Sequence, residues 1–365
     1  MRVHIEAPGP AGHGVRRHSE RVGELVAEVA EAARAGVDVG AAGWRGVAAG
    51  GVGSRAAPGG GSAVVDLTHA QFTDALWGPD VASAAEAFVR RAAELPRPLV
   101  VTLHDVPGAD PDPARDARRT AGYRRVVEAA DLVVVSARHE AAKARAFGAD
   151  PLVIPLPPPA VGEPGPPPAW AGGPSVVVLG FVYPGKGHAE AIAAAAGHPA
   201  RPRVVAAGAV SPGHEPLWTE LCARAAAAGV ELVSTGPLGD ADLVAAARAA
   251  TVPLAANRGV SASGSLLFWL ACGRVPLAAR GEYAAEVATD HPGHIRLYEP
   301  TALGAELAAA LADPSRTHAT PPTWPDVGAL HRRAYALAMA PPGDATPQAP
   351  DAVCVPPRPV ASRRC

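Results

Sequence analysis

The chain has 365 residues, of which 33 are basic and 35 acidic, so its formal net charge is −2. This balance gives no electrostatic reason to expect a nucleic-acid partner. The length is sufficient for two domains of ordinary size, each with its own core.

The sequence has no run of about eighteen apolar residues, and its first residues are too few for a signal peptide, so no transmembrane segment is expected. Four cysteines lack metal-like spacing, which favours a reducing cytoplasm over a disulfide framework. They are Cys222, Cys272, Cys354 and Cys365.

Strands and helices are predicted to alternate in the first part of the chain, the pattern of a parallel sheet covered by helices. The predicted strands are 3–5, 63–69, 99–103, 132–136 and 152–154, and the predicted helices are 19–34, 82–95, 123–130 and 139–147. His104 follows an apolar strand at its carboxyl end, where ligands of such sheets bind. It is a candidate ligand-facing donor; the alternative is a side chain that only ends the strand.

The connection PGPAGHGVRRH after the first strand is glycine-rich. Its glycines, Gly9, Gly12 and Gly14, do not have the GxGxxG spacing of a dinucleotide site. A dinucleotide cofactor is therefore not expected.

The segment 155–170, PLPPPAVGEPGPPPAW, is too rich in proline for a helix interior or a central strand. It predicts a linker between a domain at 1–154 and a domain at 171–323. The alternation resumes after it, with predicted strands at 175–179, 204–207, 231–234, 252–254, 275–278 and 294–297. The segment 324–340 predicts a helix that packs back on the first domain, and 341–365 is expected to be a disordered tail.

The stretch 257–279, NRGVSASGSLLFWLACGRVPLAA, predicts a polar loop, a short helix ended by Gly273, and a strand. Ser263, Gly264 and Ser265 then lie at a helix N-terminus, where free N–H groups and the helix dipole favour a phosphate. The alternative is that the serines only cap the helix.

Lys143 and Lys186 are the only lysines in a chain that otherwise uses arginine. Lys186, in PGKGH, therefore suggests a site that needs a compact ammonium, with chance retention as the alternative. The pairs Asp110/Asp112 and 240/242 match a DxD metal pattern, but turn and cap roles are expected for them and no metal is predicted.

A series of motifs follows in order over roughly residues 1 to 340. They are GHGVRRH, DLTHAQF, VVTLHD, ADLVVVSARHE, PLVIPLP, LGFVYPGKGHAEAI, TGPLGDADLVAAARAATVPLA, SASGSLLFWLACGRVPLAA and GEYAAEV. In this order they resemble the GT-B glycosyltransferases, and among them family 4 of the retaining enzymes. The resemblance implies an α/β chain of two doubly wound, Rossmann-like domains that face each other across a cleft.

The sequence departs from the family pattern at three positions. Phe181 follows the glycine after which the family has an arginine, and Val260 and Phe268 stand where the family has two glutamates. In the family the first glutamate helps to hold the donor sugar and the second the ribose. The motif lysine is kept as Lys186.

The resemblance implies transfer of a sugar, with retention and without a metal or cofactor, from a nucleoside diphosphate sugar to a small-molecule or glycan acceptor. It implies catalytic roles for His104 and Lys186. The expected diphosphate contacts are Gly12, Gly14, Lys186, Ser263, Gly264 and Ser265, and Gly236 and Leu238 are expected near the nucleobase. Two alternatives stay open: a non-catalytic glycosyltransferase-like partner, which the lost glutamates favour, and a nucleotide-sugar epimerase, which they disfavour.

Overall fold

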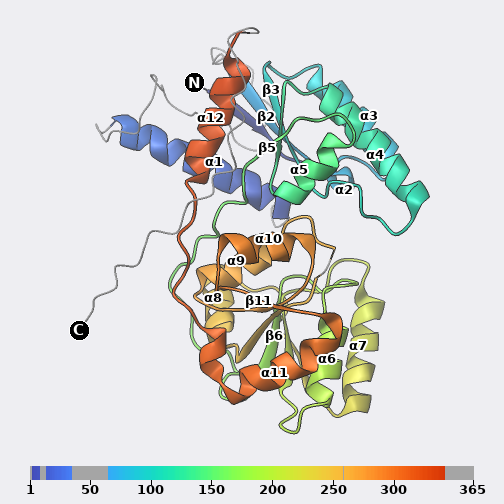
Figure 1. Ribbon diagram of the computed structural model, residues 1–365, viewed down its shortest axis with the longest axis vertical. Coiled ribbons are helices and arrows are strands. Elements are labelled where there is room, and N and C mark those ends of the chain that lie inside the picture. The colour runs from blue at the N-terminus through green and yellow to red at the C-terminus, as the bar shows by residue number, and fades with distance from the viewer. Residues whose placement is uncertain (1, 9–13, 35–64, 258, 342–365) are drawn as a thin grey trace.

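A computed structural model describes residues 2–8, 14–34, 65–257 and 259–341. The described residues form two parallel β-sheets, each covered by helices, in two lobes stacked one above the other (Figure 1). This is the α/β class predicted from the sequence.

The first sheet is parallel and its described strands follow the order β1-β2-β3-β4-β5. The strands are β1 (Val3–Glu6), β2 (Leu67–Phe72), β3 (Leu99–Leu103), β4 (Leu132–Val135) and β5 (Leu152–Val153). The helices between them are α1 (Gly14–Arg34), α2 (Asp74–Trp77), α3 (Val81–Ala92), α4 (Pro113–Glu128) and α5 (Arg138–Arg145). Every residue of β2 and β3 is buried, as is usual for parallel strands covered on both faces.

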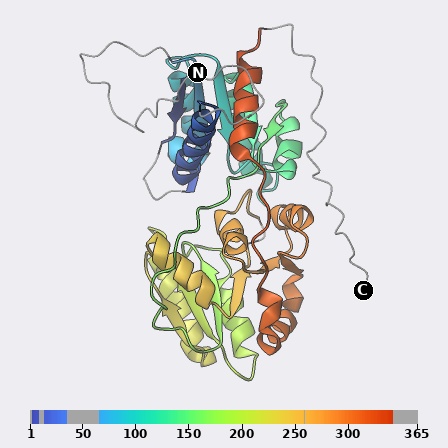
Figure 2. The ribbon, with the colours of Figure 1, turned by 90° about the vertical axis from the view of Figure 1, so that its left-hand side faces the viewer.

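Two helix layers cover this sheet. On one face Phe72 packs edge-on against Phe88 of α3 and Tyr123 of α4. On the other face lie α1 and the last helix, α12 (Val327–Met339), which returns from the far end of the chain (Figures 1 and 2). The two helices approach closely, because a Cβ on Gly328 of α12 would lie 2.7 Å from the carbonyl oxygen of Leu25.

The second sheet is also parallel, with strand order β11-β10-β9-β6-β7-β8. Its strands are β6 (Ser175–Leu179), β7 (Arg203–Ala207), β8 (Leu232–Ser234), β9 (Val252–Ala255), β10 (Leu277–Ala279) and β11 (Arg296–Tyr298). Its helices are α6 (His188–Ala196), α7 (Glu215–Ala228), α8 (Asp240–Ala249), α9 (Gly264–Ala271), α10 (Glu282–Asp290) and α11 (Leu303–Ala312), with 3-10 turns at Pro300–Ala302 and Pro314–Thr317.

The order of the second sheet reverses between β6 and β9. The chain leaves β6 towards β7 on one side and returns to β9 on the other side of β6. In sheets of this type, ligands bind beyond the carboxyl ends of the strands at such a reversal. The loops that follow β6 and β9 are therefore where a ligand site is expected.

Two predicted helix starts are wrong. Helix α1 begins at Gly14 rather than at residue 19, so part of the glycine-rich connection is helical. Helix α4 begins at Pro113 rather than at residue 123. The carboxylate of Asp112 caps α4 by accepting hydrogen bonds from the N–H groups of Ala114 (2.9 Å) and Arg115 (3.3 Å).

The remaining boundary shifts are smaller: the predicted strand 63–69 is β2 at Leu67–Phe72, and α9 begins two residues before the apolar run at 266–271. No described helix combines the length and the apolar character needed to cross a membrane. The predicted tail, apart from Pro341, lies outside the described residues.

Candidate active site

Lys186 and Ser265 meet at the reversal point of the second sheet. Lys186 is carried by the loop after β6, and Ser265 by the first turn of α9, which follows β9. The Lys186 ammonium donates a hydrogen bond of 3.0 Å to the Ser265 hydroxyl and lies 5.8 Å from the centre of the Tyr183 ring. Burial lowers the pKa of Lys186 to about 8. The side chain is thus a compact cation held in a largely dry place.

The loop that carries Lys186 packs directly against the end of β9. Gly187, the residue before α6, has φ of +102°. A Cβ at this position would lie 2.2 Å from the Cβ of Ala256, so only glycine fits both the conformation and the space. The close approach brings the loops after β6 and β9 together.

One of the two serines at the N-terminus of α9 caps the helix, and phosphate binding by the pair stays a prediction. The hydroxyl of Ser263 accepts a hydrogen bond of 3.2 Å from the N–H of Leu266 and is therefore a helix cap. The hydroxyls of Ser263 and Ser265 lie 3.3 Å apart, and that of Ser265 also accepts from Lys186. Gly264, between them, is exposed. Three of the predicted phosphate-binding residues therefore lie beside Lys186 at the positive end of a helix dipole.

A small cavity of about 10 Å³ lies between these groups. Its lining residues are Lys186, Ala255, Asn257, Val260, Ser263, Ser265, Leu266, Ala278 and Ala284. This is about the least volume that can hold one water molecule. A diphosphate would therefore contact Lys186 and the serines from outside the cavity, or the surrounding loops would have to open.

His104 is buried at the end of β3, as the sequence places it, and its described contacts belong to the first domain. Its Nε2 lies 2.8 Å from the side-chain oxygen of Gln71, and its carbonyl oxygen accepts a 2.7 Å hydrogen bond from the Tyr123 hydroxyl. Its ring meets the ring of His18 edge-on, with 5.2 Å between centroids. The catalytic role of His104 stays a prediction.

The other predicted site residues are dispersed or not described. Gly12 lies outside the described residues, and Gly14 is the exposed first residue of α1. Gly236 follows β8 with φ of +66°. Leu238 is half-buried against the apolar cluster that contains α9. Their roles towards a diphosphate or a nucleobase stay predictions.

Asn257 and Tyr183 form a contact that the sequence reading did not include. The side-chain amide of Asn257 donates a hydrogen bond of 2.7 Å to the Tyr183 hydroxyl, which ties the loop after β9 to the loop after β6. Asn257 is the only asparagine in the chain, and this could have marked it as a candidate site residue.

Asp105 is a second residue that the sequence reading missed, although it follows His104 directly. Its φ of +52° is uncommon for a residue with a side chain. The carboxylate accepts a 3.0 Å hydrogen bond from the Thr73 hydroxyl, and the carbonyl oxygen accepts one of 2.7 Å from Arg119. These contacts fix the turn that ends β3, a position where strained backbone often belongs to a functional site.

Glu140 is the third missed residue. It lies in α5 of the first domain, is only 1 % exposed, and accepts a hydrogen bond from the hydroxyl of Ser261 in the second domain. Burial raises the pKa of Glu140 to about 7. Sequence alone gives no sign that an acidic residue on this helix is buried, since the contact depends on how the two domains meet.

The three departures from the family pattern have different surroundings. Phe181 is 47 % exposed in the loop that carries Lys186, and Val260 lines the small cavity. Phe268 is buried in the apolar cluster of α9, where a carboxylate would lose its hydration. None of the three can supply a charge to a ligand.

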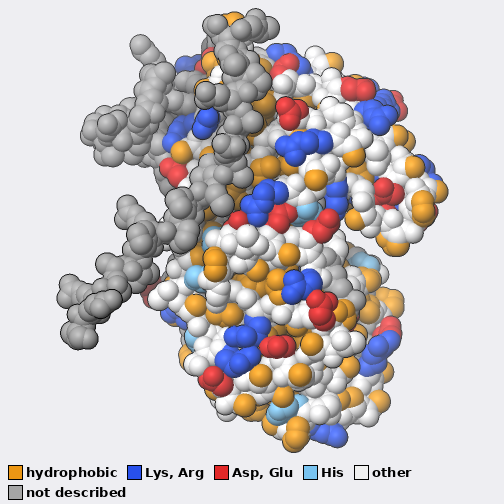
Figure 3. Space-filling view, in the orientation of Figure 1, with side chains coloured by type: hydrophobic (Ala, Val, Ile, Leu, Met, Phe, Trp, Pro, Cys, Tyr) orange, Lys and Arg blue, Asp and Glu red, His pale blue; other side chains and the backbone are white. Residues whose placement is uncertain are grey.

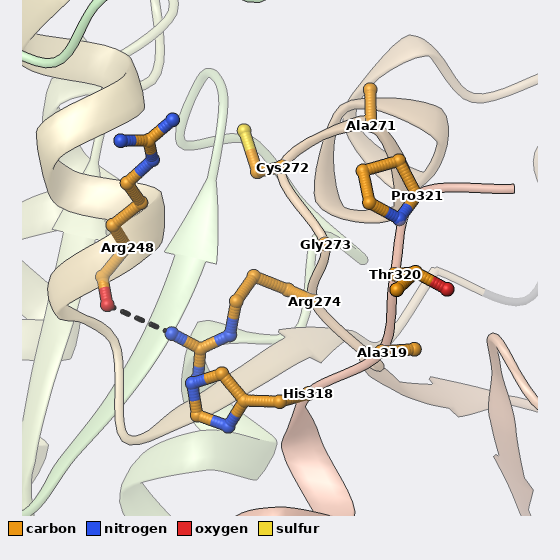
Figure 4. A pocket seen from close by; sticks show the side chains of 9 residues that line it. All are labelled: Arg248, Ala271, Cys272, Gly273, Arg274, His318, Ala319, Thr320 and Pro321. Atoms are coloured by element: carbon orange, nitrogen blue, oxygen red, sulfur yellow. Dashed lines mark hydrogen bonds between the residues drawn. The ribbon is translucent and has the colours of Figure 1, made fainter.

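A larger cavity, of about 630 Å³, lies at the opposite end of α9, where Arg248, Cys272 and Arg274 are among its lining residues (Figure 4). The guanidinium of Arg274 donates to the carbonyl oxygens of Ala247 (3.2 Å), Arg248 (2.9 Å) and Ala250 (2.5 Å). Ala247 and Arg248 lie in the last turn of α8 and Ala250 follows it, at a helix end whose carbonyls have no partner within the helix. Arg274 is thus engaged in closing a helix end.

No group of three or more His, Cys, Asp or Glu side chains with metal-binding geometry occurs within the part of the chain that the structure describes. Asp110 accepts a 3.0 Å hydrogen bond from the N–H of Asp112, and Asp112 caps α4. The turn and cap roles expected for this pair are confirmed.

Comparisons with known proteins find neither a matching family model nor a matching curated protein. Solved structures do match. Anabaena HepE in complex with UDP has a TM-score of 0.59 and 15% identity, over 93% of this chain and 96% of that one. HepE with UDP and glucose has a TM-score of 0.55 and 18% identity, over 75% and 73%. Sucrose-phosphate synthase from Thermosynechococcus elongatus has a TM-score of 0.52 and 19% identity, over 91% and 77%. At these identities the likeness concerns the fold, and the chain has the GT-B architecture of two Rossmann-like domains.

Proposed function

We propose that this chain is a glycosyltransferase that uses a nucleoside diphosphate sugar as donor and a hydroxyl group of a small molecule or glycan as acceptor. The observation that carries the proposal is the group formed by Lys186, Ser263 and Ser265 at the N-terminus of α9. A buried ammonium and a helix N-terminus at the reversal point of a parallel sheet are suited to a diphosphate.

The chemistry needs this positive charge. In the transfer, the bond between the sugar C1 and the phosphate oxygen breaks, a bond from C1 to the acceptor oxygen forms, and the acceptor proton passes to the departing phosphate. Negative charge grows on the leaving diphosphate, and preorganised donors that face it lower the barrier. Lys186 and the first N–H groups of α9 are the donors that the structure offers.

The proposal extends to retention of the anomeric configuration and to catalysis without a metal. Both are supported by the resemblance to family 4. Lys186 would then take the role that a divalent cation has in metal-dependent glycosyltransferases. HepE has been solved with UDP, and a further structure of it contains UDP-glucose, at a TM-score of 0.53 to this chain. UDP is therefore the first nucleotide to test here.

Calorimetric titration of UDP, GDP, TDP and ADP, each with EDTA, tests the donor site. We expect one of them to bind the wild type and Lys186→Met to weaken its binding about tenfold or more, because the variant loses the cation that faces the diphosphate. Lys143→Met is the matched control, since it removes the only other lysine, which lies in α5. No binding by the wild type at millimolar concentration would contradict the proposal.

The non-catalytic alternative has one observation in its favour. Val260 lines the cavity at the position where the family has a carboxylate that holds the donor sugar. Incubation of the protein with a sugar conjugate of the nucleoside diphosphate that binds most tightly distinguishes an enzyme from a non-catalytic partner protein. Slow release of the diphosphate without acceptor supports the enzyme, and binding without any release supports the partner protein. NMR of the released or transferred sugar then gives the anomeric outcome.

A further inference from the structure

The second domain caps a helix of the first domain. The N–H groups of Arg138 and His139, at the start of α5, donate hydrogen bonds of 2.8 and 2.7 Å to the carboxylate of Glu286 in α10. Helix α5 has no side-chain cap of its own, since its N-cap residue is Ala137. A carboxylate from another domain therefore satisfies N–H groups that a helix start leaves unpaired.

Ion pairs flank this cap on both sides. Arg138 donates to Asp290 at 3.1 Å, and Lys143 donates to Glu282 at 2.5 Å. Glu282, Glu286 and Asp290 are four residues apart in α10 and so share one face of that helix. Figure 3 shows basic and acidic side chains meeting along the boundary between the two lobes. Helix α5 is thus a part of the first domain that is fixed to the second.

Glu140 lies on this fixed helix and reaches the loop before α9. One of its carboxylate oxygens accepts a hydrogen bond of 2.8 Å from the N–H of Ser136, and the other accepts from the hydroxyl of Ser261. The carboxylate is buried, so the bond to Ser261 is shielded from water. A hydrogen bond shielded from water is stronger than one at the surface.

Ser261 belongs to the segment 259–263, between Asn257, which is tied to Tyr183, and Ser263, which caps α9. Its neighbour Val260 lines the cavity beside Lys186. Glu140 therefore contacts the middle of a segment whose two ends are held by the second domain itself.

We propose that Glu140 is a positioning residue: by holding Ser261, a side chain of the first domain sets the path of the segment 259–263 and thereby the affinity of the second domain for the donor diphosphate. The effect on the donor rests on the function proposed above. The effect on the segment does not, and the two are measured separately.

The first measurement needs no ligand. Hydrogen exchange of the peptide covering 259–263 is compared in the wild type, Glu140→Ala and Ser261→Ala, with the β6 peptide as a reference for global opening. We expect exchange in 259–263 to be faster in both variants while the reference is unchanged. Glu282→Gln is the matched control, because it removes an ion pair of the same domain boundary without removing either partner of the Glu140–Ser261 bond. Unchanged exchange of 259–263 in Glu140→Ala would overturn the proposal.

The second measurement is the dissociation constant of the tightest-binding nucleoside diphosphate. We expect Glu140→Ala and Ser261→Ala each to raise it about tenfold, and the double variant to raise it no further, because both remove the same bond. Glu140→Gln, which keeps a hydrogen-bonding group, is expected to restore affinity to within about threefold of the wild type. Additive effects of the two alanines would mean that Glu140 only stabilises α5, and would overturn the proposal.

The two claims fail in different ways. If no diphosphate binds the wild type, the proposed function is wrong, and the exchange measurement still decides whether Glu140 positions the segment. If a diphosphate binds the wild type and Glu140→Ala equally well, the proposed function stands and the effect of Glu140 on donor affinity is wrong.

Discussion

The Lys186 ammonium and the Ser265 hydroxyl are joined by a hydrogen bond of 3.0 Å, although they are 79 positions apart in the chain. The bond links the loops that follow β6 and β9, which are neighbours in the sheet. Lys186 is thereby fixed in a buried position, where its charge is costly to keep without a partner anion.

Nucleotide binding should weaken as the pH rises through the pKa of Lys186. Burial lowers this pKa to about 8, so above pH 8 the free protein loses the proton that a diphosphate needs beside it. We expect the dissociation constant of the bound diphosphate to rise about tenfold between pH 7 and pH 9. Calorimetry at the two pH values measures this. An affinity that stays constant over this range would show that the ammonium does not face the ligand.

The protein should lose stability in mild acid because buried histidines are held neutral. Burial lowers the pKa of His18 and of His331 to about 3, and that of His188 to about 4. Between these values and about 6.5 the unfolded chain binds more protons than the folded one, so stability falls as the pH falls. Each such histidine costs about 1 kcal/mol between pH 7 and pH 5.5. Urea unfolding at the two pH values measures the sum.

His331→Leu isolates one of these contributions. Both ring nitrogens of His331 are buried and have no hydrogen-bond partner among the residues described. The variant therefore loses no bond at pH 7, and its stability should fall less in acid than that of the wild type. His69→Leu is the contrasting variant, because His69 is hydrogen-bonded to Tyr335 and Thr102, both at 2.8 Å, and its loss should destabilise at every pH. An unchanged acid response in His331→Leu would contradict this account.

Glu140→Gln should raise stability at alkaline pH and have little effect in mild acid. Burial raises the pKa of Glu140 to about 7, so the folded protein binds this proton more tightly than the unfolded chain does. Its contribution is complete below the unfolded pKa of about 4.3 and is lost as the pH rises to 7. Glutamine has no proton to lose, and we expect a gain of about 1–3 kcal/mol at pH 8 in urea unfolding. A variant that is destabilised at pH 8 would show that the charge itself holds Ser261.

Gly328→Ala should destabilise the first domain. A Cβ there would lie 2.7 Å from the carbonyl oxygen of Leu25, so α12 would have to move away from α1. Overpacking of this kind costs about 1–3 kcal/mol. Gly304→Ala in α11 is the matched control: nothing lies within 4 Å of its added Cβ, and alanine should stabilise that helix by about 0.5–1 kcal/mol. Thermal unfolding should show a lower midpoint temperature for Gly328→Ala and a higher one for Gly304→Ala than for the wild type.

The meeting of Lys186 with α9 could be predicted from the sequence, since the carboxyl ends of parallel strands lie at one edge of a sheet. The contact of Glu140 with Ser261 could not, because it depends on how two separately folded domains are oriented. Local patterns give the elements of each domain and leave that orientation open.

The two wrong helix starts have separate causes. In α1 the buried face begins with Val15 and includes His18 and Ser19, polar residues that an apolar pattern does not count. The first part of α4 is mostly exposed and has only small, polar or charged residues, so it has no spacing of large apolar side chains to detect. The signal there was the pair Asp112 and Pro113, a cap followed by a proline at the first helical position.

The return of α12 to the first domain affects how this protein is made. Tyr335, near the end of the described chain, is completely buried and bonds to His69 of β2. The first domain therefore cannot complete its core until the whole second domain has left the ribosome, even though most of its strands are synthesised early. A fragment that stops at the linker would lack one of the two helices that cover a face of its sheet. Expression of the first domain alone therefore requires that residues 324–340 be joined to it.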